Sequence, residues 1–130
     1  MLTYQLCAAT PVLAVSDVDQ TAAWYREILG FEAHLFPDTP PSAFGILVRQ
    51  GTEIMLRRLQ EGEQAPRPSV AWDVYVRVTG NTLLGLWEAL RERVEVVEPL
   101  CRQFYGDTEF TIRDCDGRMI CLSELLPQSA

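Results

Sequence analysis

Several short stretches of the chain alternate between hydrophobic and polar positions, a pattern that predicts strands with one buried face. The clearest is residues 70–78, where Val74, Val76 and Val78 alternate with polar or aromatic side chains. Residues 7–16 alternate in the same way, and Pro11 favours an edge strand or a bulge there. Further strands are expected at about 31–36, 43–49, 52–58, 95–101, 108–114 and 118–124, with tight turns at Gln50-Gly51 and Asp116-Gly117.

Two other stretches, residues 18–29 and 81–93, carry hydrophobic residues at helical spacing. Asp17 or Asp19 is the expected N-cap of the first helix, and Asn81 is the expected N-cap of the second. Each helix carries one Trp, and the two Trp side chains are expected to pack in the core or at an interface.

The order of these elements, a strand, a helix and three strands, occurs twice. An offset of 63 residues aligns Trp24 with Trp87. An offset of 66 aligns the later strands through the pairs Phe44 and Phe110, Ile46 and Ile112, Gly51 and Gly117, Ile54 and Ile120, and Leu56 and Leu122. The sequence therefore predicts one α+β domain over 1–130 built from two βαβββ modules, at about 7–58 and about 70–125, joined by a linker at 59–69 that is rich in Pro, Gly and polar residues.

The alternation also predicts which side chains lie on the face of each sheet that the helix does not cover. The even positions of 70–78, Trp72 included, are expected to face the helix. The opposite face is expected to collect Thr10, Glu53, Met55, Arg57, Asp73, Tyr75, Arg77, Glu109, Thr111, Arg113 and Cys121. Two interpretations stay open: a cup that holds a small amphiphilic molecule, or the solvated side of an ordinary antiparallel sheet.

Composition narrows the class of partner. The formal net charge of −7 disfavours nucleic acid and mildly favours a cationic ligand. No apolar run is long enough for a membrane span, and the first residues lack a signal-peptide pattern, so we expect a cytoplasmic protein that does not bind membranes. The four cysteines contain no CxxC spacing and are expected to be reduced thiols.

Motifs at both ends resemble one superfamily. The chain begins with Pro11-Val-Leu-Ala-Val-Ser-Asp-Val18, followed by Trp24-Tyr25 and Leu29-Gly30-Phe31, and this resembles the opening of a glyoxalase / bleomycin-resistance / dioxygenase (vicinal oxygen chelate) domain. The run from Tyr105-Gly-Asp-Thr-Glu-Phe110 through Asp114-Cys-Asp-Gly117 to Glu124 resembles the closing motif. The resemblance covers nearly the whole chain. It implies that the two modules form an open, cup-shaped mixed β-barrel, with the helices outside, around a small organic molecule.

Many members of that superfamily chelate a divalent metal with His, Gln and Glu side chains. The resemblance places the corresponding positions at Thr10, Met55, Asp73 and Cys121. Only Asp73 is a good ligand for a hard divalent ion, and a catalytic site normally has about three protein ligands. We therefore expect no metal and no other cofactor, and we expect His34 at the surface. An unusual metal held by Asp73 and Cys121 stays as an alternative.

Metal-free members include the bleomycin-resistance proteins, which resemble this chain in being short, acidic and dimeric. The resemblance implies a homodimer that binds a small molecule, such as a cationic or aromatic antibiotic, and has no catalytic residues. The alternative is a lyase, isomerase or dioxygenase with an atypical or absent metal site, in which Asp73 acts with Tyr75 and Arg77. In the simpler interpretation Asp73 only pairs with an arginine. A module that binds no ligand would instead have a filled cup.

The ligand-binding residues expected from these arguments are Thr10, Met55, Arg57, Trp72, Asp73, Tyr75, Arg77, Thr111, Arg113 and Cys121. Cys121 is expected to be an inert buried thiol rather than a nucleophile. The expected rim of the site is Phe36, Phe44, Phe104 and Tyr105.

Overall fold

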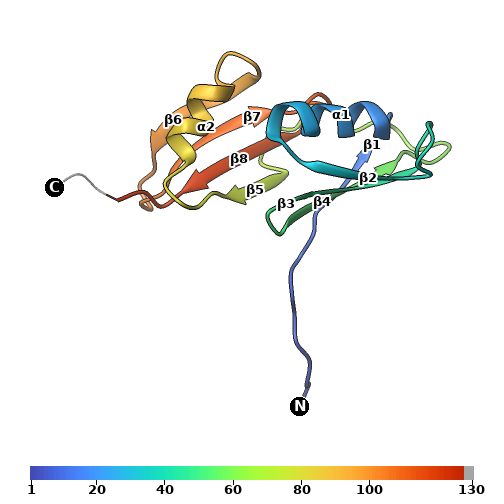
Figure 1. Cartoon of the computed structure of the whole chain (residues 1–130), viewed down its shortest axis with the longest axis horizontal. Helices are drawn as coiled ribbons and strands as arrows, with labels where there is room; N and C mark the ends of the chain where they lie inside the picture. Colours follow the sequence, from blue (N-terminus) through green and yellow to red (C-terminus); the bar gives the residue numbers. More distant parts are fainter. Residues whose placement is uncertain (128–130) are drawn as a thin grey trace. The chain divides into compact units, whose positions relative to one another are not determined.

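Two four-stranded mixed sheets, each with one helix against it, make up the computed structural model, which describes residues 1–127 (Figure 1). The first unit contains β1 (Val12–Val15), α1 (Val18–Leu29), β2 (Glu32–Phe36), β3 (Phe44–Arg49) and β4 (Thr52–Arg58). The second contains β5 (Val74–Arg77), α2 (Leu83–Leu90), β6 (Glu95–Arg102), β7 (Thr108–Arg113) and β8 (Met119–Glu124). This is the predicted βαβββ order, present twice. No helix within residues 1–127 is both long and apolar enough to cross a membrane.

The strand order is the same in both sheets, β1-β4-β3-β2 and β5-β8-β7-β6, and in each the first strand runs parallel to the last. Val12 pairs with Met55 in the first unit, and Tyr75 pairs with Cys121 in the second. These two pairs are related by the offsets of 63 and 66 residues found in the sequence, so the ladder confirms that part of the repeat.

The third strand of each unit, β3 and β7, departs by one residue from the alignment of the two repeats that the sequence predicted. Ile46 pairs with Met55, but it is Thr111, not Ile112, that pairs with Cys121. The pairs Phe44 with Phe110 and Ile46 with Ile112 were therefore wrong. The reason lies in the turns: Gln50-Gly51 alone joins β3 to β4, whereas residues 114–118 join β7 to β8.

The predicted tight turn at Asp116-Gly117 is thus part of a longer loop. The Asp114 carboxylate shapes it by accepting the backbone N–H of Asp116 at 2.8 Å and of Arg118 at 3.0 Å. Gly117 has φ +82° and packs against Pro68, whose Cα would lie 3.3 Å from an added Cβ, so a side chain is unfavourable there on both counts.

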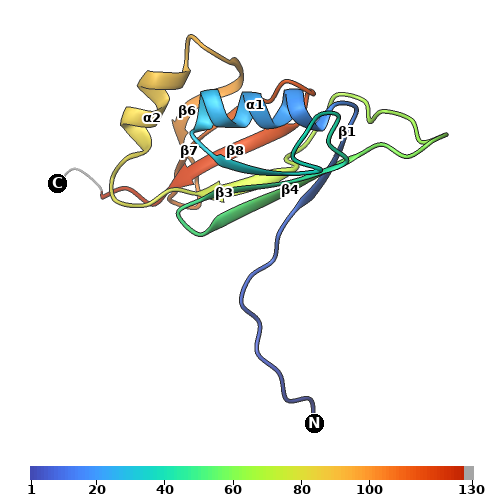
Figure 2. The same ribbon diagram turned by 45° about the vertical axis from the view of Figure 1, so that its right-hand side comes forward.

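Two strands are shorter than predicted. The strand expected at 7–16 covers only Val12–Val15, and the one expected at 70–78 covers only Val74–Arg77. Residues 1–9 alternate as a strand would, but all of them are exposed, and this segment runs away from its own sheet (Figure 2). Alternation alone does not make a strand where no neighbouring strand supplies hydrogen bonds.

Helices cover the hydrophobic face of each sheet, as predicted. The buried residues of the first unit include Leu13, Val15, Val18, Ala22, Tyr25, Leu47, Ile54 and Leu56. Those of the second unit include Val74, Leu83, Leu90, Phe110, Ile112, Ile120 and Leu122. Trp24 and Trp87 both pack within their own units, with ring centroids 5.1 Å from Tyr25 and 5.1 Å from Phe110 respectively. Burial of these side chains is the main stabilising term in each unit.

The start of α1 follows the prediction. The Asp17 carboxylate accepts the backbone N–H of Gln20 at 3.0 Å. Asp19, the alternative cap, instead accepts the backbone N–H of Ser42 at 2.8 Å and its hydroxyl at 2.9 Å, which fixes the loop between β2 and β3. Gly30, at φ 74°, ends the helix.

The start of α2 differs from the prediction, because Asn81 is not its cap. Asn81 has a positive φ of 58°, and the backbone N–H groups at this end of α2 are bound by the carboxylate of Glu124, at the end of β8. Glu124 Oε2 accepts from Asn81 N at 2.7 Å, and Oε1 accepts from Thr82 N at 3.0 Å and Leu83 N at 3.1 Å. The side chain is 6% exposed, so a buried carboxylate meets the positive end of the helix and holds it to the last strand.

We expect Glu124→Ala to lower the free energy of unfolding by about 1–3 kcal/mol, because it leaves three N–H groups near the helix start without an acceptor. The midpoint and slope of urea denaturation measure this loss. Glu92→Ala is the matched control, since Glu92 is exposed just after α2. Equal midpoints for the two variants would contradict a stabilising role for the Glu124 carboxylate.

Candidate functional site

On the face of each sheet opposite its helix, residues paired across the strands form rows. The central row of the first unit is Val12, Met55, Ile46 and His34. The equivalent row of the second unit is Tyr75, Cys121, Thr111 and Glu98. The first row is largely apolar, whereas the second carries a phenol, a thiol, a hydroxyl and a carboxylate. The side chains that could take part in binding or catalysis therefore lie mainly on the second unit.

A buried carboxylate lies at the centre of these groups. Glu109, on β7, is 5% exposed. Its Oε2 accepts the hydroxyl of Tyr75 at 2.9 Å, and its Oε1 accepts a short hydrogen bond from the hydroxyl of Tyr105. The Tyr75 oxygen is also hydrogen-bonded to Ser123 Oγ at 2.8 Å and lies 3.4 Å from Asp107 Oδ2. We call Tyr75, Tyr105, Asp107, Glu109 and Ser123 the Glu109 cluster.

Aromatic and cationic side chains flank the Glu109 cluster. Trp72 Nε1 donates to Thr111 Oγ1 at 3.2 Å, and the Trp72 and Tyr75 ring centroids are 4.9 Å apart. The Arg77 guanidinium lies 5.3 Å from the Tyr75 ring centroid and 3.6 Å from Asp107 Oδ2. The prediction that Trp72 faces the helix was wrong, because β5 begins only at Val74 and the alternation does not extend to residue 72.

Glu109 also contributes to the raised pKa values of three neighbouring groups, Tyr75, Tyr105 and Cys121. Its hydrogen bond is the main cause that raises the pKa of Tyr105. Burial is the main cause that raises the pKa of Tyr75 and that raises the pKa of Cys121 to about 12, and the negative charge of Glu109 adds to both. Both phenols and the thiol are therefore protonated at neutral pH and act as donors around the carboxylate.

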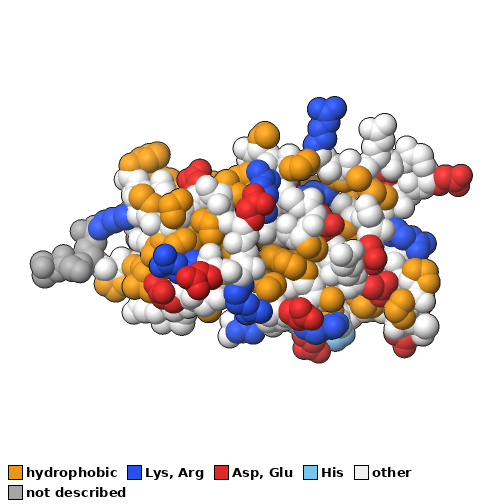
Figure 3. Space-filling model, turned by 90° about the horizontal axis from the view of Figure 1, so that it is seen from above, with side chains coloured by type: hydrophobic (Ala, Val, Ile, Leu, Met, Phe, Trp, Pro, Cys, Tyr) orange, Lys and Arg blue, Asp and Glu red, His pale blue; other side chains and the backbone are white. Residues whose placement is uncertain are grey.

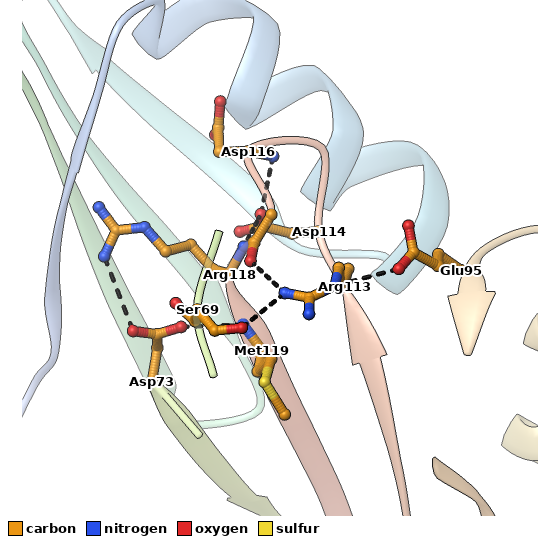
Figure 4. A network of polar contacts seen from close by, with 9 residues as sticks. Ser69, Asp73, Glu95, Arg113, Asp114, Asp116, Arg118 and Met119 are labelled. Atoms are coloured by element: carbon orange, nitrogen blue, oxygen red, sulfur yellow. Dashed lines mark hydrogen bonds and ion pairs between the residues drawn. The ribbon is translucent and has the colours of Figure 1, made fainter. Parts of the chain in front are cut away.

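Asp73, the strongest predicted ligand for a metal, lies in a neighbouring network (Figure 4). Its Oδ2 accepts the backbone N–H of Met119 at 2.8 Å, and its Oδ1 lies 3.8 Å from an Arg118 nitrogen. The expected pairing of Asp73 with an arginine thus exists, with Arg118 as the partner, while Arg77 pairs with Asp107. Both oxygens of Asp73 are engaged in holding the entry to β5 against β8.

Arg113 binds the segment before β5 to the loop between β7 and β8 (Figure 4). Its Nη1 donates to the carbonyl oxygens of Ser69 at 2.9 Å and Gly117 at 2.8 Å, and its Nε lies 3.0 Å from Glu95 Oε2. These contacts are structural, and they fix the position from which Trp72 reaches the Glu109 cluster.

The three predicted site residues of the first unit have local partners. Thr10 Oγ1 donates to Glu53 Oε1 at 3.5 Å, and Met55 lies between Val12 and Ile46 in the apolar row. Arg57 donates two hydrogen bonds to Glu63, at 2.9 and 2.7 Å, and these bonds are the main cause that lowers the pKa of Glu63 to about 2.

The residues at the superfamily's metal-ligand positions do not fit a hard divalent ion. Thr10 and Met55 are poor ligands, Asp73 is engaged on both oxygens, and Cys121 is a fully buried thiol whose pKa is raised to about 12. Within residues 1–127, no group of three or more His, Cys, Asp or Glu side chains could hold a metal ion. His34 is exposed beside Glu32, at 3.4 Å.

The structure thus brings five predicted residues together at the Glu109 cluster: Trp72, Tyr75, Arg77, Thr111 and Cys121. Sequence reasoning placed Glu109 on the correct face and Tyr105 on the rim, but left both out of the ligand-binding set. It missed Asp107 and Ser123. The alternation of β8 carries a signal for Ser123, two residues after Cys121, whereas Asp107 lies in a loop and no periodic pattern marks it.

Charge is mixed on the face of the molecule that Figure 3 shows. In the view of Figure 3, acidic and basic side chains are interspersed with apolar ones, and neither sign forms a large patch.

Comparison with known proteins identifies the family. Residues 8–122 match the profile of the Glyoxalase/Bleomycin resistance protein/Dioxygenase superfamily. No curated protein sequence matches the chain significantly.

Solved structures share the fold. A glyoxalase-related enzyme from Clostridium phytofermentans is 18% identical, with a TM-score of 0.75 over 95% of this chain and 98% of that one. A glyoxalase/bleomycin resistance protein/dioxygenase from Nocardioides is 16% identical, with a TM-score of 0.72 over 98% and 89%. A virulence protein from Salmonella typhimurium is 26% identical, with a TM-score of 0.65 over 97% and 100%. With this fold and with a profile match over most of its length, the chain belongs to the Glyoxalase/Bleomycin resistance protein/Dioxygenase superfamily.

Proposed function

We propose that this protein binds a small cationic or aromatic molecule at the Glu109 cluster, without a metal and without turning it over. The observation that carries the proposal is the environment of Glu109. Its carboxylate is 5% exposed, yet its hydrogen-bond partners are two neutral phenols and the neutral Cys121 thiol, and within residues 1–127 it forms no ion pair. A buried charge without a countercharge is costly, and a cationic ligand would supply one.

The carboxylate has capacity left for such a ligand. Two carboxylate oxygens offer about four lone pairs, and the phenols of Tyr75 and Tyr105 use one on each oxygen. Asp107 adds a second carboxylate beside Tyr75, and its arginine partner, Arg77, is 74% exposed and so only weakly screens it. We propose that an ammonium or guanidinium group binds at these two carboxylates, where the remaining lone pairs would let the phenol hydrogen bonds stay in place.

Aromatic side chains supply the apolar part of the proposed site. Trp72 is 48% exposed, Tyr105 is 45% exposed and Phe104 is 98% exposed, and the Phe104 and Tyr105 rings meet edge to face at 5.0 Å. Exposed rings of this size are suited to stacking with a flat ligand and to cation–π contact with a charged one. Acidic groups next to exposed rings match a cationic aromatic molecule better than an anion or an aliphatic acid.

The chemistry of the cluster favours binding over turnover. Tyr75, Tyr105 and Cys121 all have raised pKa values, so none is a nucleophile or a general base near neutral pH. Asp73, the acid–base candidate of the alternative function, is held by Met119 and Arg118. A binding role also agrees with the bleomycin-resistance part of the superfamily to which the chain belongs.

We expect Glu109→Gln to weaken binding of a cationic aromatic antibiotic by at least about tenfold, because one charge-assisted contact is lost. Bleomycin is the first probe of a panel that also contains uncharged aromatic compounds. Quenching of the tryptophan fluorescence in the presence of a chelator, compared with that of Trp72→Phe, reports binding near Trp72, and mass spectrometry of the recovered ligand reports turnover.

Glu88→Gln is the matched control, because it removes the same charge from an exposed position on α2. The proposal fails if no cationic compound in the panel binds, or if the two variants bind equally well. Chemical change of the ligand would instead support the enzymatic alternative.

We also expect Cys121 to resist alkylation in the folded protein, because it is fully buried and its pKa is raised to about 12. Iodoacetamide at neutral pH should modify the exposed Cys7, Cys101 and Cys115, and all four thiols should react in urea. The raised pKa also predicts that stability is retained below pH about 9 and falls between about 9 and about 12, since only the unfolded chain is readily deprotonated there. Rapid labelling of Cys121, mapped by mass spectrometry, would revive the nucleophile hypothesis.

A further inference from the structure

We propose that the ligand of the Glu109 cluster is a zwitterionic aromatic molecule, and that Arg77 selects it by binding its anionic group. This inference rests on the proposed function, because it adds a second contact of opposite charge to the same site. It makes Arg77 a residue that determines specificity, whereas Glu109 supplies the contact with the cationic group.

Strand pairing places Arg77 and Glu109 in one row of the second sheet. Arg77 on β5 pairs with Ser123 on β8, and Ser123 pairs with Glu109 on β7. This row lies two residues along the strands from the row that begins with Tyr75, so both rows are on the face opposite the helix. The backbones of Arg77 and Glu109 are thus two strand spacings apart, or about 10 Å. That spacing is on the scale of one aromatic ring with a charged group at each end.

Tyr75 contacts both charged groups. The Arg77 guanidinium lies 5.3 Å from the centroid of its ring, and its hydroxyl donates to Glu109 Oε2 at 2.9 Å. Trp72 is 48% exposed, and its ring centroid lies 4.9 Å from that of Tyr75, so an aromatic surface adjoins the two charges. A ligand that lies along Tyr75 would meet an anion-binding group at the ring and a cation-binding group at the hydroxyl.

The Arg77 guanidinium is open to a ligand. Its side chain is 74% exposed, and its nitrogen lies 3.6 Å from Asp107 Oδ2, which is an ion pair but too long for a hydrogen bond. A guanidinium carries five N–H donors in a fork that matches the oxygens of a carboxylate or phosphate. The contact with Asp107 therefore leaves donors of Arg77 for an anionic group.

Three other arginines show what an arginine committed to the fold looks like in this chain. Arg57 donates two hydrogen bonds to one carboxylate, and Arg113 donates to two backbone carbonyl oxygens. Arg118 is 12% exposed and pairs with Asp73. Arg77 has neither the burial of Arg118 nor the paired hydrogen bonds of Arg57, and an exposed ion pair such as its own contributes little to stability.

The mixed charge of the site predicts which ligands it prefers. A purely cationic ligand is attracted by Glu109 but repelled by Arg77. A purely anionic ligand is attracted by Arg77 but repelled by Glu109 and Asp107. A ligand that carries both charges can place each one beside its opposite, so it should bind more tightly than either.

Three compounds of similar shape separate these cases. The first, 4-(aminomethyl)benzoate, carries both charges, 4-methylbenzylamine carries only the positive one, and 4-methylbenzoate carries only the negative one. NMR titration of the isotope-labelled protein gives each dissociation constant. We expect the wild type to bind the zwitterion at least about fivefold more tightly than 4-methylbenzylamine, and 4-methylbenzoate most weakly. In Arg77→Gln the ratio of zwitterion to cation affinity should fall to about one, because the zwitterion loses an attraction and the cation loses a repulsion.

Arg93→Gln is the matched control, since it removes the same charge from an exposed position after α2 and should keep the wild-type ratio. Binding of 4-methylbenzylamine to Arg77→Gln shows that the site of this variant is intact. Equal affinity of the wild type for zwitterion and cation, or the same ratio in both variants, would overturn the role of Arg77. The proposed function, which Glu109→Gln tests, would survive either result. If neither the zwitterion nor the cation binds to the wild type, both proposals fail.

Discussion

Each unit depends on one parallel pairing, between its first strand and its last. Because β1 lies beside β4 and β5 beside β8, the connection after the first strand must cross the sheet, and the helix is the element that makes this crossing. The helix then covers one face, and the register of the strand pairings decides which side chains lie on the other face. In the second unit the pairing has an additional support, since Glu124 at the end of β8 binds the start of α2. The rows on the face opposite the helix, and with them the Glu109 cluster, follow from this pairing together with the hairpin pairing of β7 with β8.

The parts of the fold that local patterns determine could be predicted from the sequence. The bounds of α1 and β4 matched the prediction, because capping by Asp17, the stop at Gly30 and the Gln50-Gly51 turn act over a few residues. The errors lie where a distant partner decides the outcome. Residues 7–9 were expected to continue the strand of β1, but they are exposed, and the contacts with β4 begin only at Thr10 and Pro11. The cap of α2 comes from Glu124, 42 residues beyond Thr82 in sequence, and no local rule connects the two. The one-residue shift of β7 arises from the length of a loop whose turn residues alone suggested a shorter one.

The second unit contains two buried carboxylates that are stabilised in different ways. Glu124 binds three backbone N–H groups near the helix start, so its charge faces fixed dipoles and its role is complete within the fold. Glu109 is held by phenols that are themselves neutral, and its charge has no such compensation. Stability alone favours the first arrangement, since a neutral residue in place of Glu109 would avoid the cost of burying a charge. The weak compensation of the Glu109 charge next to exposed aromatic rings is therefore the feature on which the proposed binding function rests.

The repeat makes this contrast sharper, because the two units offer an internal comparison. Strand pairing makes Met55 equivalent to Cys121, Ile46 to Thr111 and Val12 to Tyr75. The same backbone thus carries an apolar row in one unit and a hydrogen-bonding row in the other. The first unit shows that this backbone does not require polar groups on the face opposite the helix. The polar groups there in the second unit are therefore specific to its sequence and are not a requirement of the fold. Thr10 and Met55, at two of the superfamily's metal-ligand positions, belong to the first unit and are poor ligands for a hard divalent ion.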